Sequence, residues 1–142
     1  MTTPEAHWEH FAHQADIGIR GIGPSLASAF EQAGLALTAV ITRPDLVAGR
    51  DCVIIRVEGK NPELLFVDWL NALLTEMAIR RMLFSRFEVS LHLPLLEARV
   101  WGEPVAASRH RPAVEVKGAS YAGLHVAQTP DSMWRAECIV DV

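Results

Sequence analysis

The segment Asn61–Ala78, NPELLFVDWLNALLTEMA, decides which class of fold the chain can adopt. It opens with Asn61-Pro62-Glu63, which is typical of a helix start, because proline is tolerated at the first helical position and an acid in the first turn favours the helix dipole. The apolar residues that follow have the spacing of one helical face: Leu64, Val67, Leu70, Leu74, Met77 and Ala78. The segment therefore predicts a helix that packs its apolar stripe against a core.

A second helix is predicted upstream, starting at Ser25. The Ser25 hydroxyl caps the first free amide groups, and Pro24 restricts the chain as it enters the helix. Arg43-Pro44-Asp45 ends this helix, since the residue before a proline is pushed toward extended backbone. Its apolar residues again share one face: Leu26, Phe30, Ala33, Leu37 and Val40.

Strand-like segments precede, separate and follow the two helices. They are His7 to Phe11, Asp16 to Ile22, Val53 to Val57, Phe87 to Leu93, Leu96 to Trp101, Val114 to Tyr121, Leu124 to Ala127 and Met133 to Val140. Two early helices and mostly late strands predict an α+β fold, with a mostly antiparallel β-sheet and two main helices packed on one face. We expect residues 1–142 to form a single domain, with a loose terminus at residues 1–6.

Composition argues against several classes of protein. Half of the residues (50%) are hydrophobic and 21% are charged, which is typical of a folded chain. The net charge of -4 disfavours direct binding to nucleic acid, which needs a concentrated positive surface. No apolar segment reaches the roughly 20 residues that span a membrane, and the first residues do not resemble a signal peptide. We expect a cytoplasmic protein with a protein or small-ion partner.

Histidines and cysteines do not predict a zinc site. His7, His10 and His13 are spaced by three, and in a strand this spacing alternates between the two faces. Cys52 and Cys138 lie far apart, and neither belongs to a CxxC pair. We interpret both cysteines as buried reduced thiols that act as small hydrophobic residues.

No catalytic motif is present. The glycine-rich run Gly18–Gly23 follows no apolar strand, so we interpret its glycines as bulge or turn positions rather than as a phosphate-binding loop. Trp101-Gly102-Glu103-Pro104 and His110 are interpreted as a connection between strands, with a pocket lining as the alternative. The chain lacks GxSxG, Walker and GxGxxG patterns.

Two acidic features are ambiguous when each is taken alone. Asp16 precedes a predicted strand, where an aspartate either caps the loop or binds a metal. Asp141 and Val142 place a side-chain carboxylate beside a main-chain carboxylate, and hard cations such as Ca²⁺ and Mg²⁺ prefer such oxygen ligands. The residues by themselves leave a structural and a metal-binding role open for both features.

Taken together, six segments between about His7 and Val142 resemble the archease family. They are HFAHQADIG at 10–18, LASAFEQA at 26–33, LFVDWLN at 65–71, WGEP at 101–104, VKGASY at 116–121 and VDV at 140–142. The family often has His-Thr-Ala-Asp where this chain has His13-Gln14-Ala15-Asp16, a difference that keeps the aspartate. It also often has a histidine where this chain has Ala122.

The resemblance implies a function that residue spacing does not show. Archeases assist RtcB-type RNA ligases, so the chain is expected to be an accessory protein and not an enzyme. It would promote guanylylation and multiple turnover of the ligase in tRNA splicing or RNA repair, and would meet RNA only indirectly through the ligase. The implied metal ligands are Asp16, Asp141 and the terminal carboxylate of Val142, holding Ca²⁺ with Mg²⁺ as the alternative. His13 is expected to orient the loop that carries Asp16.

Two other functions remain open at this stage. A metal-dependent hydrolase or nuclease would use the same acidic pair, with His13 or His110 activating a water molecule. A chaperone-like interaction module would instead dock a partner on the sheet surface, without a metal.

Overall fold

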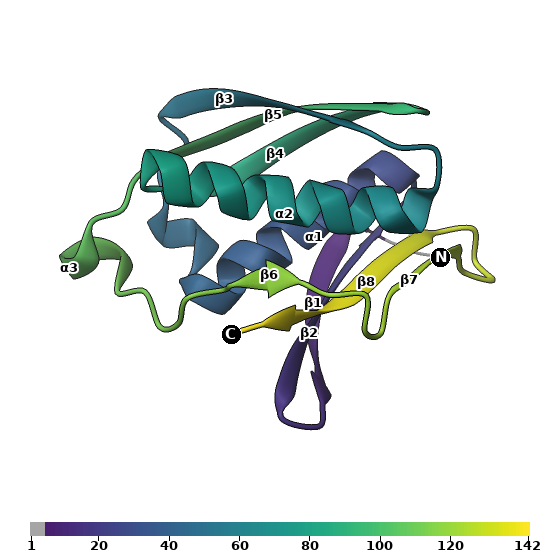
Figure 1. Ribbon diagram of the computed structural model, residues 1–142, viewed down its shortest axis with the longest axis horizontal. Coiled ribbons are helices and arrows are strands. Elements are labelled where there is room, and N and C mark those ends of the chain that lie inside the picture. The colour runs from purple at the N-terminus through teal and green to yellow at the C-terminus, as the bar shows by residue number, and fades with distance from the viewer. Residues whose placement is uncertain (1–4) are drawn as a thin grey trace.

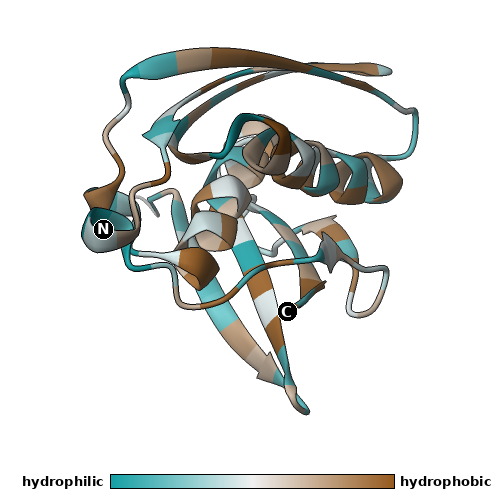
Figure 2. Cartoon of the chain, turned by 60° about the vertical axis from the view of Figure 1, so that its left-hand side comes forward, coloured by the Kyte–Doolittle hydropathy of each residue, from teal (hydrophilic) through white to brown (hydrophobic). Residues whose placement is uncertain are grey.

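Helices α1 (Leu26–Ile41) and α2 (Pro62–Arg80) lie between two antiparallel sheets in a computed structural model that describes residues 5–142 (Figures 1 and 2). The five-stranded sheet has the order β1 (His7–His13), β2 (Asp16–Gly23), β8 (Trp134–Asp141) and β6 (Gly118–Ala119), and β7 (His125–Gln128) also pairs with β8. The three-stranded sheet has the order β3 (Asp51–Glu58), β5 (Leu95–Pro104) and β4 (Met82–His92). Two short helices, η1 (Pro44–Leu46) and α3 (Ala107–His110), lie in connections.

The predicted α+β class with two main helices and antiparallel strands is confirmed. The structure adds that the strands are divided between two sheets, so each sheet uses one face to cover the helix pair. The alternation of apolar and polar residues indicates that one face of a strand is buried, but it does not indicate which sheet the strand joins.

Both main helices begin at the predicted residues. The Ser25 side chain accepts a hydrogen bond from the Ser28 amide at 3.0 Å. The Asn61 side-chain oxygen accepts from the amides of Glu63 and Leu64, at 2.9 and 3.2 Å. These caps satisfy amide groups that have no partner inside the helix.

The two helices share one hydrophobic core. Phe30 and Trp69 are fully buried, and the Trp69 indole N–H donates to the Phe30 carbonyl oxygen at 3.0 Å. Ala33 and Leu37, predicted on the apolar face of α1, are also fully buried. The indole bond allows a large polar aromatic group to be buried without an unsatisfied donor.

Three sequence predictions about the strands are wrong. Trp101–Pro104 is not a connection but the end of β5, where Pro104 pairs with Met82. Strand β4 begins at Met82, earlier than predicted, because a register shift between Phe84 and Arg86 breaks the alternation. Between residues 114 and 121 only β6 is a strand. Residues 114–116 instead line an apolar hollow together with Leu74 and Met77 of α2.

The predicted loose terminus at residues 1–6 falls partly on residues 1–4, which lie outside the described residues. Glu5 and Ala6 have no regular secondary structure. Across residues 5–142, no helix combines the length and the apolar character that crossing a membrane requires.

The glycines of Gly18–Gly23 are not bulge or turn positions, because β2 pairs with β1 and β8 without any register shift. These glycines instead allow neighbouring groups to approach the backbone of β2 closely. A Cβ atom at Gly21 would lie 2.0 Å from the Ala29 carbonyl oxygen and 2.4 Å from the Ala33 nitrogen. Gly21 therefore sets how closely α1 packs on β2.

We predict that Gly21→Ala lowers the free energy of unfolding by about 2–3 kcal/mol, because the added methyl group forces α1 away from β2. Gly49→Ala is the matched control, since its Cβ would meet only the Trp101 Cβ atom, at 3.4 Å. Urea unfolding of both variants measures the effect. Equal free energies of unfolding for the two variants would contradict a tight contact between α1 and β2 at Gly21.

Candidate metal centre

Asp16 and Asp141 lie at the shared end of two neighbouring strands. In the register of β2 and β8, Ile17 is opposite Val140, so Asp16 and Asp141 are the next residues outward along the two strands. Both residues are exposed and line one shallow hollow of about 230 Å³, together with Ser120, Ala122, Ile139 and Val140. The structure thus brings together two carboxylates from opposite ends of the sequence.

The segment around β6 holds Asp141 in place from the other side. The Lys117 amide donates to the Asp141 carbonyl oxygen at 2.7 Å, and the Ser120 amide donates to the Ile139 carbonyl oxygen at 3.0 Å. The Asn71 side chain on α2 accepts from the Ala119 amide at 2.9 Å. Strand β8 therefore ends between two partners, β2 and β6, and is tied to the helix layer through Asn71.

His13 lies opposite Asp16 across the β1–β2 turn, in which Gln14 adopts a φ of 56°. Its position beside Asp16 is compatible with the predicted role in orienting this turn. His10 is turned to the other face, where its Nε2 contacts the Ala36 carbonyl oxygen at 2.8 Å, and His7 contacts Glu9 at 3.4 Å. The three histidines therefore do not converge on one site. This agrees with the prediction from their spacing, which places successive histidines on opposite faces of a strand.

The potential metal ligands among the side chains that line the hollow are all oxygen atoms: the carboxylates of Asp16 and Asp141 and the hydroxyl of Ser120. Such a set fits hard cations such as Ca²⁺ or Mg²⁺ and does not fit zinc, which favours nitrogen and sulfur. Val142 follows Asp141 directly and is 42% exposed, but it does not line the hollow.

Within residues 5–142, no three side chains of His, Cys, Asp or Glu are grouped to hold a metal. The predicted ligand set does not require three such side chains, because its third ligand is the main-chain carboxylate of Val142.

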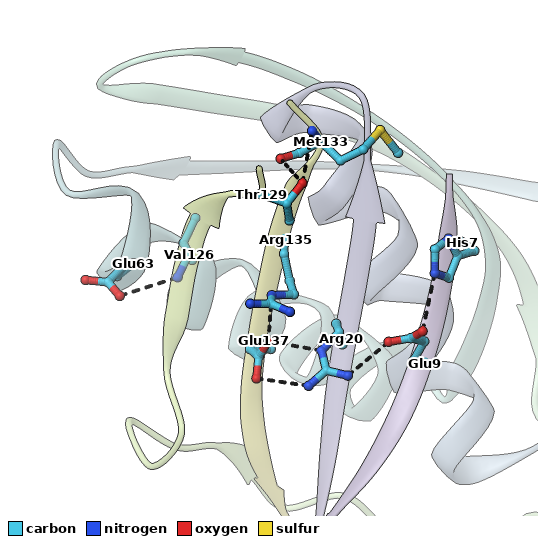
Figure 3. Close-up of polar contacts among 9 residues, drawn as sticks. All are labelled: His7, Glu9, Arg20, Glu63, Val126, Thr129, Met133, Arg135 and Glu137. Atoms are coloured by element: carbon cyan, nitrogen blue, oxygen red, sulfur yellow. Dashed lines mark hydrogen bonds and ion pairs between the residues drawn. The ribbon is translucent and has the colours of Figure 1, made fainter. Parts of the chain in front are cut away.

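A network of charged residues occupies the same outer face of the five-stranded sheet (Figure 3). Arg20 donates from Nε to Glu137 at 3.0 Å and from Nη1 to Glu9 at 2.9 Å, so it links β1, β2 and β8. Its guanidinium also lies 4.5 Å from the centre of the Phe11 ring. The hydrogen bond from Arg20 lowers the pKa of Glu9, despite partial burial. This network fixes the three strands that position Asp16 and Asp141.

Sequence reasoning missed the Arg20 network. Its signal was present in the alternation of β2, where Asp16, Gly18 and Arg20 share the outer face. The partners Glu9 and Glu137 become visible only once the strand order is known, because they belong to the neighbouring strands β1 and β8.

Glu103 and His110, which sequence analysis placed in a connection or pocket, form a buried polar cluster. Glu103 accepts hydrogen bonds from the Ala48 amide at 2.8 Å and from Arg109 at 2.8 Å, and its other contact is His110 Nε2 at 3.0 Å. His110 Nδ1 accepts from the Ala106 amide at 2.9 Å. Both ring nitrogens are occupied, so His110 is not free to activate a water molecule.

The cysteines differ from each other. Cys138 is buried as predicted, and burial raises the pKa of its thiol to about 12. Cys52 is exposed, so the interpretation of Cys52 as a buried thiol was wrong. It belongs to the residues of β3 that face away from the helices, whereas Val53 and Ile55 face the core.

Fold and site define a class of small α+β proteins in which the ends of two paired strands bring two aspartates together. The sequence model of the Archease protein family matches residues 8–142, and the chain belongs to this family. Protein archease from Pyrococcus abyssi is 36% identical over 139 residues, covering 95% of this chain and 98% of the relative. Protein archease-like from Drosophila melanogaster is 30% identical over 151 residues, covering 98% and 92%.

A solved structure shares the fold. The solution structure of Methanobacterium thermoautotrophicum protein 1598 superposes with a TM-score of 0.82 at 27% identity, covering 95% of this chain and 98% of that one. The close agreement shows that the overall arrangement of helices and sheets is common to both proteins.

We predict that Glu103→Gln flattens the acid side of the stability profile. The Ala48 amide, followed by His110, holds the pKa of Glu103 below its usual value of 4.5. A lowered folded pKa gives stability that is present above the unfolded pKa and is lost as pH falls through the folded pKa. Urea unfolding between about pH 7 and pH 3 measures this loss.

The control for this experiment is Glu115→Gln, a change at an exposed position. The Glu103→Gln variant should be less stable at neutral pH and should lose less stability in acid than the control. An unchanged acid slope would show that Glu103 does not contribute to acid unfolding.

Proposed function

We propose that this archease-family protein is a metal-binding accessory factor for an RtcB-type RNA ligase. It promotes guanylylation of the ligase and allows multiple turnover, in tRNA splicing or RNA repair. Its metal ligands are Asp16, Asp141 and the carboxylate of Val142, and the cation is Ca²⁺, with Mg²⁺ as the alternative. The observation that carries the proposal is that Asp16 and Asp141 line one hollow, in a chain that has archease relatives.

Electrostatics support a cation at this place. Two ionised carboxylates at adjacent strand ends repel each other. A divalent cation bound between them would cancel the repulsion and supply positive charge that attracts a phosphate group or a carboxylate of a partner. The chain's own contribution is to hold the two aspartates in register, through Arg20 on one side and Lys117 on the other.

The remaining features agree with an accessory role. The net charge of -4 favours a protein partner, with RNA met indirectly through the ligase. His110 has no free ring nitrogen for catalysis. We accordingly propose a cytoplasmic protein that has no catalytic activity of its own.

We predict that Asp16→Asn and Asp141→Asn each abolish stimulation of the ligase while leaving the fold intact, because both side chains are exposed. Cation affinity should fall at least about tenfold, since even residues that only orient a ligand often cost that much. Ligase guanylylation and multiple-turnover RNA joining, with and without each variant, measure the effect.

Asp68→Asn is the matched control, because Asp68 is an exposed aspartate on α2, away from the hollow. It should stimulate the ligase like the unaltered protein. Normal stimulation by either site variant would reject the metal-site mechanism. Cleavage of RNA by the pure protein, without ligase, would favour the nuclease alternative.

A separate prediction concerns Val142. Adding one glycine after Val142 moves the main-chain carboxylate away from Asp141 while keeping both aspartates. Calorimetric titration with Ca²⁺ should show at least about tenfold weaker binding in the extended protein. Unchanged affinity would remove Val142 from the ligand set and leave the aspartates as the site.

A further inference from the structure

Two of the three proposed metal ligands belong to the last residues of the chain, so the site depends on how these residues are held. Asp141 ends β8, and Val142 follows it. The Lys117 amide donates to the Asp141 carbonyl oxygen at 2.7 Å, and this carbonyl belongs to the peptide that joins Asp141 to Val142. Terminal residues are poorly ordered unless other parts of the fold tie them down. The bond from Lys117 therefore fixes the direction in which Asp141 and Val142 leave the sheet.

Strand β6, which directly follows Lys117, is very short. It contains only Gly118 and Ala119, which pair with Asp141 and Val140 of β8. The strand lies at the edge of the five-stranded sheet. A backbone amide of β6 that points away from β8 must therefore find a partner outside the sheet or be left to water. Two residues form too few ladder hydrogen bonds to hold such an edge on their own.

Asn71 on α2 provides a partner for one of these amides. Its side-chain oxygen accepts a hydrogen bond from the Ala119 amide at 2.9 Å. Asn71 lies in the middle of α2, between Leu70 and Leu73, which are both fully buried in the core. The acceptor is thus mounted on a well-packed helix, and it takes the place that the backbone of a further strand would otherwise fill.

Helix α2 makes a second contact of the same kind with the neighbouring short strand. The Glu63 carboxylate accepts from the Val126 amide of β7 at 3.4 Å (Figure 3). Strand β7 pairs with residues Trp134 to Glu137, at the beginning of β8. Of these two contacts from α2, the one made by Asn71 lies at the end of β8 that carries the proposed ligands, and the one made by Glu63 lies at the opposite end.

We propose that Asn71 is a positioning residue for the cation, acting through β6 on Asp141 and Val142. This role rests on the proposed metal site. Asn71 keeps β6 against the end of β8, and the Lys117 amide beside β6 then holds the Asp141 carbonyl. Without the acceptor, the Ala119 amide would lose its partner and β6 would be released. A cation would then have to order the last two residues before both carboxylates could bind it, which weakens the affinity.

The first test is calorimetric titration of the full chain with Ca²⁺. Asn71→Leu removes the acceptor with little change in side-chain volume. It should weaken Ca²⁺ binding about tenfold, as the loss of groups that orient metal ligands often does. Asn71→Asp keeps an oxygen acceptor in the same place and should bind Ca²⁺ at least nearly as tightly as the unaltered protein. Recovery by aspartate distinguishes a hydrogen-bond acceptor from a side chain that only fills space.

Glu63→Leu is the matched control, because it removes the acceptor that α2 offers to the β7 amide. The change perturbs the same helix and the neighbouring strand. Its calcium affinity should nevertheless equal that of the unaltered protein, because β7 pairs with the opposite end of β8 from Asp141.

Amide hydrogen exchange measures the state of β6 without any metal. In Asn71→Leu the amides of Lys117 and Ala119 should exchange faster, while the amides of α1 keep the rates of the unaltered protein. In Asn71→Asp both amides should keep their slow exchange, which separates the retained hydrogen bond from an effect of the added charge on Ca²⁺. Asn71→Ala takes the place of the leucine variant if that variant loses helix content.

The outcomes separate this role of Asn71 from the proposed metal site itself. Unchanged calcium affinity of Asn71→Leu, together with weakened binding by Asp16→Asn, would overturn the positioning role and leave the metal site standing. Equal weakening by Glu63→Leu would also overturn it, because the loss would then reflect a general effect of disturbing α2. If the unaltered protein does not bind Ca²⁺, or if Asp16→Asn binds it equally well, the metal site is wrong and the positioning role is wrong with it.

Discussion

Helix α1 approaches strand β2 more closely than any side chain at position 21 would permit. A Cβ there would meet the Ala29 backbone at 2.0 Å, so the contact exists only because the residue is glycine. This contact fixes β2 against the helix layer, and β2 in turn pairs with β1 and β8. Within residues 5–142, no helix covers the face of the five-stranded sheet opposite α1, and the candidate site lies on that face.

Polar groups on this face hold the three strands in register. Arg20 bonds to Glu9 on one neighbour and to Glu137 on the other, and both carboxylates are partly shielded from water. A one-residue slip of β8 would break these bonds and move Asp141 away from Asp16. The charged network thus stabilises strand alignment, and strand alignment determines whether the two aspartates can share a cation.

Local sequence signals predicted the elements better than their arrangement. Ser25 and Asn61 cap their helices as expected, because capping depends on neighbouring residues only. The role of Gly21 was missed, since its reason lies in α1 and not in β2. Cys52 was predicted to be buried because an apolar run alone does not say which alternate residues face the core.

The candidate site could not be predicted from local signals either. Asp16 and Asp141 carried no specific signal alone, and the family resemblance was needed to connect them. The structure shows the physical link, which is the pairing of the first residues of β2 with the last residues of β8.

The proposed function depends on a divalent cation at the shared end of β2 and β8. The most direct test is a crystal structure of the protein grown with CaCl₂, followed by replacement with Mn²⁺ to obtain an anomalous signal. We expect an ion whose oxygen ligands, at about 2.3–2.6 Å for Ca²⁺, include the carboxylates of Asp16 and Asp141. An ion bound only elsewhere, or a hollow filled by water alone at saturating calcium, would contradict it.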